Sequence, residues 1–122
     1  MTILGLDHVQ VTAPTGCEGA ARHFYGTLLG LPETPKPEGV RATGGVWFRC
    51  GAQGIHVGVE EGFRPARKAH PGLAVDGDAS LAALAARLVE EGVELEWDTR
   101  IAGVRRCYVR DPWGNRVELV AR

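Results

Sequence analysis

The hydrophobic pattern of the first 60 residues predicts one strand, one helix and then three short strands. Residues 3–13 alternate polar and apolar side chains, which is typical of a half-buried strand. From residue 17 to residue 29 the apolar side chains recur at helical spacing, and Gly30 follows as a C-terminal cap. A proline-rich segment over 31–39 predicts a surface loop. Short β-type runs follow at 40–43, 46–50 and 55–59.

The same order of patterns returns after a polar connector over residues 61–69. Residues 70–76 predict a strand, and Asp78 is a candidate N-cap for a helix that ends before Gly92. A strand signal near 99–104 is faint. Clearer strand-like runs cover 93–97, 107–110 and 116–120, and the turn sequence DPWGN over 111–115 joins the last two.

One offset relates the two halves of the chain. His8 and His70 are 62 residues apart, as are Gly30 and Gly92, and as are His56 and Glu118. A duplicated module of about 60 residues explains all three coincidences. We therefore predict a single α+β domain over 1–122, with module one at 1–60 and module two at 70–122. The two tandem βαβββ modules are expected to form a cupped mixed sheet of about eight strands with helices outside.

Composition and charge narrow the possible partners. The 122 residues carry a formal net charge of −1, so a nonspecific grip on nucleic acid is disfavoured. No apolar run is long enough to span a membrane, and the first residues lack a secretory pattern, so we expect a cytoplasmic protein. The three cysteines are widely spaced and form no CxxC motif, which indicates neither a disulfide framework nor a thiolate zinc site.

Four repeat-related positions carry the candidate chemistry. These are His8, His56, His70 and Glu118. His8, His56 and Glu118 are opposite in strand phase to their apolar neighbours, so the set is expected on the face away from the helices. Imidazole and carboxylate together suit a divalent first-row metal and leave sites open for substrate. A histidine on the polar face of a strand can also be simply solvated, and His23 in the first helix is interpreted in that way.

Four segments of the chain resemble the vicinal oxygen chelate superfamily, the glyoxalase, bleomycin-resistance and extradiol-dioxygenase group. These are GLDHVQVTAP, HFYGTLLGL, HPGLAVDG and YVRDPWGNRVELV, and they extend over essentially the whole length. The most specific is the DPxGN turn followed by a glutamate on the next strand. The resemblance implies paired βαβββ modules and a metal held by His8, His70 and Glu118.

The position of His56 departs from part of this family. Glyoxalase I and methylmalonyl-CoA epimerase carry glutamate or glutamine there and use it as a fourth ligand. Extradiol dioxygenases and fosfomycin-resistance transferases use only the three ligands that correspond to His8, His70 and Glu118. A histidine at this position could still bind metal. The metal could be nickel, zinc, manganese or iron, since all accept these donors.

The resemblance also suggests substrate contacts and an assembly. Trp47 and Tyr108 are expected to line the cup, although both could simply pack. Arg64, together with Arg67 and Lys68, could clamp an anionic group, although a solvated basic loop is an alternative. Similar proteins of this size often form homodimers with sites shared between chains, so we expect a homodimer.

Two classes of function follow from these observations. The first is a metal-dependent enzyme that acts on a small oxygen-rich substrate by bidentate chelation, with Glu118 as the catalytic residue. Lyase or isomerase chemistry is slightly favoured over ring-cleaving dioxygenase or thiol transferase chemistry. The alternative is a metal-free protein that binds a drug or another small molecule, as bleomycin-resistance proteins do.

Overall fold

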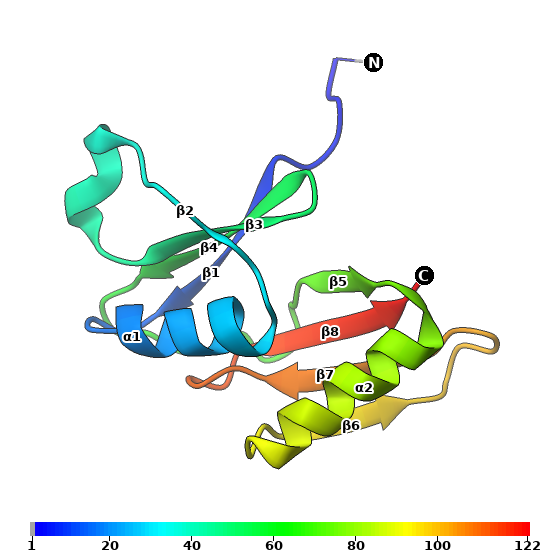
Figure 1. The fold of residues 1–122 in the computed structure, drawn as a ribbon. Helices are drawn as coiled ribbons and strands as arrows, with labels where there is room; N and C mark the ends of the chain where they lie inside the picture. Colours follow the sequence, from blue (N-terminus) through cyan, green and yellow to red (C-terminus); the bar gives the residue numbers. More distant parts are fainter. Residues whose placement is uncertain (1) are drawn as a thin grey trace. The chain divides into compact units, whose positions relative to one another are not determined.

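The computed structural model describes residues 2–122, and the chain divides into two compact units, Met1–Arg64 and Pro65–Arg122. Residue 1, the first of the predicted module one, lies outside the described residues. Each unit has its own open sheet of four strands (Figure 1). None of the helices in residues 2–122 has the length and apolar character that crossing a membrane requires.

The first unit has the sheet order β1-β4-β3-β2, with β1 parallel to β4 and the other pairs antiparallel. Its strands are β1 (His8–Ala13), β2 (Glu33–Thr34), β3 (Val46–Cys50) and β4 (Gln53–Val59). Its helical segments are α1 (Glu18–Ala21), the π-helix η1 (Arg22–Leu28) and the 3-10 helix η2 (Glu38–Thr43).

The second unit repeats this topology with the order β5-β8-β7-β6, and β5 is parallel to β8. Its elements are β5 (Gly72–Val75), α2 (Gly77–Glu90), β6 (Leu95–Asp98), β7 (Arg106–Arg110) and β8 (Arg116–Ala121). The register repeats as well, because Gln10 pairs with His56 in one unit and Gly72 pairs with Glu118 in the other. The α+β class and the tandem βαβββ modules are therefore confirmed, as two mixed four-stranded sheets.

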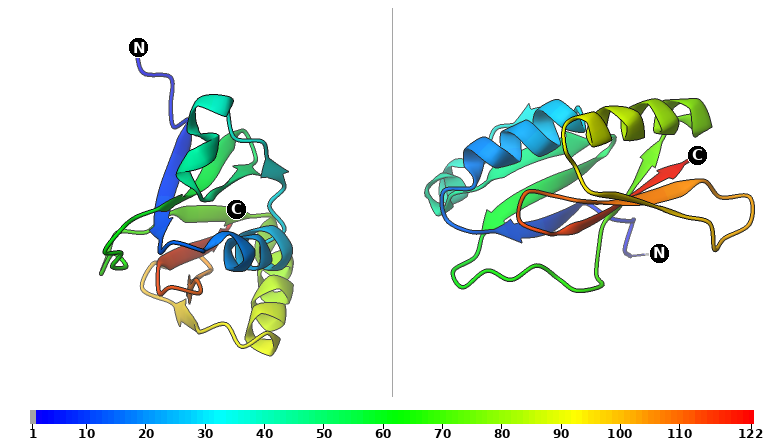
Figure 2. Two further views of the ribbon diagram at one scale, coloured as in Figure 1. Left: turned by 90° about the vertical axis from the view of Figure 1, so that its left-hand side faces the viewer. Right: turned by 90° about the horizontal axis from the view of Figure 1, so that it is seen from below.

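One face of each sheet is covered by helix and the other is left for polar side chains. In the second unit, Leu81, Ala85 and Leu88 of α2 are buried, and so are the inward residues of β7 and β8 (Cys107, Val109, Val117 and Leu119). Figure 2 shows α2 lying along one face of this sheet. In the first unit, η1 buries Phe24, Tyr25 and Leu28, and Tyr25 packs beside Phe48 of β3. In each unit, the apolar face of the helix therefore packs against the apolar face of the sheet, as the helical spacing and the strand alternation in the sequence predict.

Several predicted boundaries in the first unit are wrong. The first strand begins at His8 and not at residue 3, and residues 40–43 lie in η2 instead of a strand. The strand that completes the module is β2, inside the segment predicted to be loop, where two residues between Pro32 and Pro35 pair with β3. Local β-propensity is overridden at residues 40–43 because Val40 is exposed and has no partner strand.

A glycine explains how η2 returns to the sheet. Gly45 has a φ of +87°, and a Cβ on it would lie 2.1 Å from the carbonyl oxygen of Val57. Only glycine permits this close approach of two backbones. Its N–H donates to Oε2 of Glu18 at 2.6 Å, which ties the turn to the start of α1.

The second unit needs smaller corrections. The strand β5 begins at Gly72, so His70 precedes it, although the carbonyl of Pro71 already accepts from the N–H of Glu118 at 2.9 Å. The N-cap of α2 is Asp76, and Asp78 lies in the first turn. The faint strand near 99–104 is absent, and the described residues there form turns.

The DPWGN segment is a closed turn that fixes the register of β7 and β8. Oδ1 of Asp111 accepts from the backbone N–H groups of Trp113 at 3.0 Å and Asn115 at 2.8 Å, and the Asn115 amide donates to Oδ2 at 2.8 Å. Asp111 and Asn115 are both buried, so these bonds satisfy polar groups away from water. The register that results places Tyr108 opposite Glu118.

Candidate metal-binding residues

The four residues predicted as metal ligands fall into two clusters, one in each unit. The first cluster, which we call the histidine stack, consists of His8, Trp47 and His56. The second, which we call the charge cluster, is built around His70 and Glu118. Among residues 2–122 no group of three or more His, Cys, Asp and Glu side chains gathers as a ready-made metal site.

In the histidine stack, the ring of His56 lies between two other rings. The indole of Trp47 is 3.8 Å away at 4°, and the imidazole of His8 is 4.3 Å away at 16°. The stack fits because Gly54 has no side chain: a Cβ there would lie 3.0 Å from Nε2 of His56. His56 is buried at 8% exposure, whereas the His8 side chain remains 45% exposed.

Burial decides the electrostatics of this stack. Desolvation lowers the pKa of His56, the neighbouring His8 lowers it further, and Asp7 partly opposes both. The ring of His8 also contacts Asp7, since its Nδ1 lies 2.7 Å from Oδ2 of that residue. A hydrogen bond of this kind orients an imidazole and leaves its Nε2 for another partner.

The stacked geometry limits how this cluster can bind metal. An imidazole offers its lone pair in the plane of the ring, and the planes of His8 and His56 are nearly parallel. An ion in the plane of one ring would lie well off the plane of the other. Ligation of one ion by both histidines stays a prediction, and it requires one ring to turn.

In the charge cluster, Nε2 of His70 lies 3.2 Å from Oε1 of Glu118. The two side chains are 25% and 15% exposed. Nδ1 of His70 lies 2.8 Å from the carbonyl oxygen of Lys68. Tyr108 packs its ring edge-on against His70, with centroids 5.2 Å apart at 89°.

The residues of this pair fit a divalent metal. Because the Lys68 carbonyl can only accept, Nδ1 of His70 donates to it, and Nε2 faces the carboxylate oxygen of Glu118. Either a proton on Nε2 or a cation between the two atoms can join them. Nitrogen and oxygen ligands at about 2.1 Å from one ion are themselves roughly 3 Å apart, which matches the observed separation.

The sequence interpretation missed the charged neighbours of Glu118. Nη1 of Arg106 lies 3.4 Å from Oε1 of Glu118, and its Nη2 lies 3.3 Å from Oδ2 of Asp98. Arg100 binds the same Asp98 and, as the main cause, holds the pKa of that carboxyl well below its ordinary value. Strand parity could have found Arg106, since it shares the face of Tyr108 and Glu118 on paired strands.

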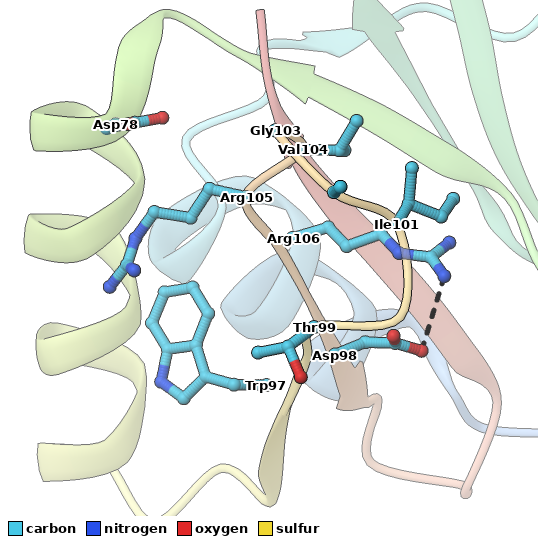
Figure 3. Close-up of a pocket in the computed structure, with 10 residues that line it drawn as sticks. Asp78, Trp97, Asp98, Thr99, Ile101, Gly103, Val104, Arg105 and Arg106 are labelled. Carbon is cyan, nitrogen blue, oxygen red and sulfur yellow. Dashed lines mark ion pairs between the residues drawn. The ribbon is translucent and has the colours of Figure 1, made fainter.

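The candidate substrate residues lie in different surroundings. Tyr108 is covered by the guanidinium of Arg116 at 3.7 Å, and both line a cavity of about 430 Å³. Trp47 lines another of about 330 Å³ together with Lys36 and Arg41. Arg64 is exposed and lines neither. A further cavity of about 550 Å³, shown in Figure 3, has the Asp98–Arg106 ion pair in its wall.

The comparison with family models decides the identity of the fold. Residues 5–119 match the model described as the Glyoxalase/Bleomycin resistance protein/Dioxygenase superfamily. The chain belongs to this superfamily. Members of the glyoxalase superfamily commonly use a divalent metal and bind small molecules. A search of curated proteins found no significant match.

Several solved structures superpose on nearly the whole chain. A glyoxalase family protein from Bacillus anthracis is 47% identical with a TM-score of 0.92, over 98% of this chain and 96% of that one. A lactoylglutathione lyase from Agrobacterium tumefaciens is 22% identical with a TM-score of 0.77, over 99% and 96%. A fosfomycin resistance protein from Listeria monocytogenes is 18% identical with a TM-score of 0.77, over 98% and 94%. The last two likenesses concern the fold alone.

The lowered pKa of His56 predicts a pH dependence of stability. Below pH 6.5, the ordinary pKa of histidine, His56 binds a proton in the unfolded chain but not yet in the folded chain. The free energy of unfolding therefore falls as pH decreases from about 6.5. One proton limits the slope to about 1.4 kcal/mol per pH unit. His56→Phe, which keeps a ring in the stack, should reduce this slope in urea titrations between pH 7.5 and 5. An unchanged slope would show that other groups cause it.

Proposed function

We propose that this protein is a metal-dependent enzyme that acts on a small oxygen-rich substrate by bidentate chelation. The observation that carries the proposal is the His70–Glu118 pair, in which Nε2 of the imidazole and a carboxylate oxygen face each other at 3.2 Å. The Lys68 carbonyl fixes the tautomer that ligation requires. Membership of the superfamily supports the same conclusion, because divalent metals are common in it.

The proposed ligands are His70 and Glu118, with His8 as the third. His8 would come from a first unit of the same chain or of a second copy. Its Nδ1 is held by Asp7, which leaves Nε2 for the ion. His56 occupies the fourth position of the repeat, and in the stacked arrangement it supports His8 by ring contact. Nickel, zinc, manganese and iron all suit such donors.

The proposed chemistry is that of a lyase or isomerase. A bound divalent ion would polarise two adjacent oxygens of the substrate and so acidify the neighbouring carbon. Glu118 is the proposed catalytic residue, which exchanges a proton with that carbon. Trp47 and Tyr108 would contact the substrate; Trp47 lies beside His56, and Tyr108 lies beside His70. Arg64, which is exposed, is the proposed clamp for an anionic group of the substrate.

The metal is tested by elemental analysis of protein purified without chelator. We expect close to one equivalent of a transition metal in the wild type, and His70→Ala should lower that content at least about tenfold. His23→Ala is the matched control, because His23 is an exposed histidine of η1. Circular dichroism should show both variants folded. Wild-type protein with under a tenth of an equivalent, also after incubation with each candidate metal, would favour the metal-free binding alternative.

The reaction class is tested with three substrates. We expect turnover of the hemithioacetal of methylglyoxal and glutathione, and none of a catechol or of fosfomycin with thiol. Glu118→Gln should lower kcat by about a hundredfold or more, because an amide cannot take a proton. Glu96→Gln is the control, since Glu96 lies on the same sheet face but contacts neither histidine nor Arg106 among the described interactions. Cleavage of the catechol would instead support the hypothesis that the protein is a dioxygenase.

We also propose a homodimer. Ile3, Leu4 and Leu6 precede the edge strand β1 and are 79%, 94% and 73% exposed, which is unusual for a surface without a partner. Light scattering should give a mass of about 26 kDa, twice the 13.1 kDa of one chain. The double substitution Leu4→Asp with Leu6→Asp should shift the mass toward one chain, whereas Val89→Asp on α2 should not. A monomeric wild type would exclude this assembly.

A further inference from the structure

Arg106 is a mostly buried cation that joins Glu118 to Asp98. Its side chain is 12% exposed, and its two terminal nitrogens lie 3.4 Å from Oε1 of Glu118 and 3.3 Å from Oδ2 of Asp98. Its Nε is buried and has no hydrogen-bond partner among the described residues. Leaving a buried donor unsatisfied costs free energy, which the two ion pairs of the same guanidinium offset.

The formal charges around Glu118 nearly cancel. Asp98 is bound by two guanidinium groups, those of Arg100 and Arg106, so the three side chains together carry one positive charge. That charge lies against the one negative charge of Glu118. Both groups of this contact are mostly buried, at 12% and 15% exposure, so water screens it weakly.

From this charge balance, and resting on the metal site of the proposed function, we infer that Arg106 determines specificity for anionic ligands. The guanidinium cancels the charge that Glu118 would otherwise contribute, so a divalent ion bound there keeps most of its own positive charge. An anionic molecule with two adjacent oxygens, such as an α-hydroxycarboxylate, is then bound in preference to a neutral molecule of the same shape. The same guanidinium repels the ion and weakens its binding.

Removal of this charge should have two effects of opposite sign. In Arg106→Gln, Co²⁺ should bind about tenfold more tightly, because repulsion by a nearby unit charge is lost. The preference for an anionic ligand should fall about tenfold for the same reason. A residue that only kept the site in shape would lower both affinities together.

Lactate and lactamide are suitable probes, because both offer two vicinal oxygens and they differ in charge. The full-length protein is titrated with Co²⁺, and the loaded protein is then titrated with each probe by following its visible absorption. The ratio of the two probe affinities measures the preference. Arg105→Gln is the matched control: it makes the same change in net charge, but Arg105 stacks on Trp97 and does not contact Glu118. It should change the ratio less than about twofold.

Asp98→Asn provides a second test should Arg106→Gln fail to fold. It removes the carboxylate that opposes Arg106, so the preference for lactate should rise and Co²⁺ should bind more weakly. A fall in the preference in Asp98→Asn would overturn the inference, as would weaker Co²⁺ binding with an unchanged ratio in Arg106→Gln. In both cases the metal site itself would stand. Wild-type protein that binds no Co²⁺ would refute the proposed function, and with it this inference.

Discussion

Parallel pairing of the first and last strands within each unit is the constraint on which the site depends. It brings side chains 48 residues apart in the chain into contact, His8 with His56 and His70 with Glu118. Parallel strands need a long crossover between them, and here the helix and the two antiparallel strands of each module supply it. The helix covers one face of the sheet and leaves the other free for polar side chains. The candidate chemistry is therefore a consequence of the topology and not of local sequence.

The two units have the same topology, but the candidate ligands lie in different physical environments. In the first, rings stack on one another around a buried histidine whose pKa is lowered by desolvation. In the second, an imidazole and a carboxylate meet within a network of guanidinium groups. Trp47 and Tyr108, which pair with His56 and Glu118 respectively, follow the same division, since one stacks on His56 and the other makes a T-shaped contact with His70. The two units thus share their backbone register, while the side chains at the same register positions differ.

In the charge cluster, the carboxylate of Glu118 contacts two different side chains. Glu118 contacts both His70 and Arg106 through the same oxygen, Oε1. Arg106 depends in turn on Asp98, and Asp98 on Arg100. Because Asp98, Arg106 and Glu118 are mostly shielded from water, a change of charge at one of them affects the others. The properties of Glu118 are therefore set by residues two strands away as much as by its own neighbours.

The sequence by itself determined the class of fold and the repeat, and it named the residues of the ligand hypothesis. Hydrophobic period and the 62-residue offset carry that information, because strand parity and helix faces are local properties of the chain. It could not determine that β2 forms between two prolines while residues 40–43 become a 3-10 helix, since the choice depends on which segment finds a partner in β3. Nor could it reveal the histidine stack or the bridge from Asp98 through Arg106 to Glu118. Those contacts exist only once separate strands share a sheet face, and distance across a sheet is not encoded by spacing along the chain.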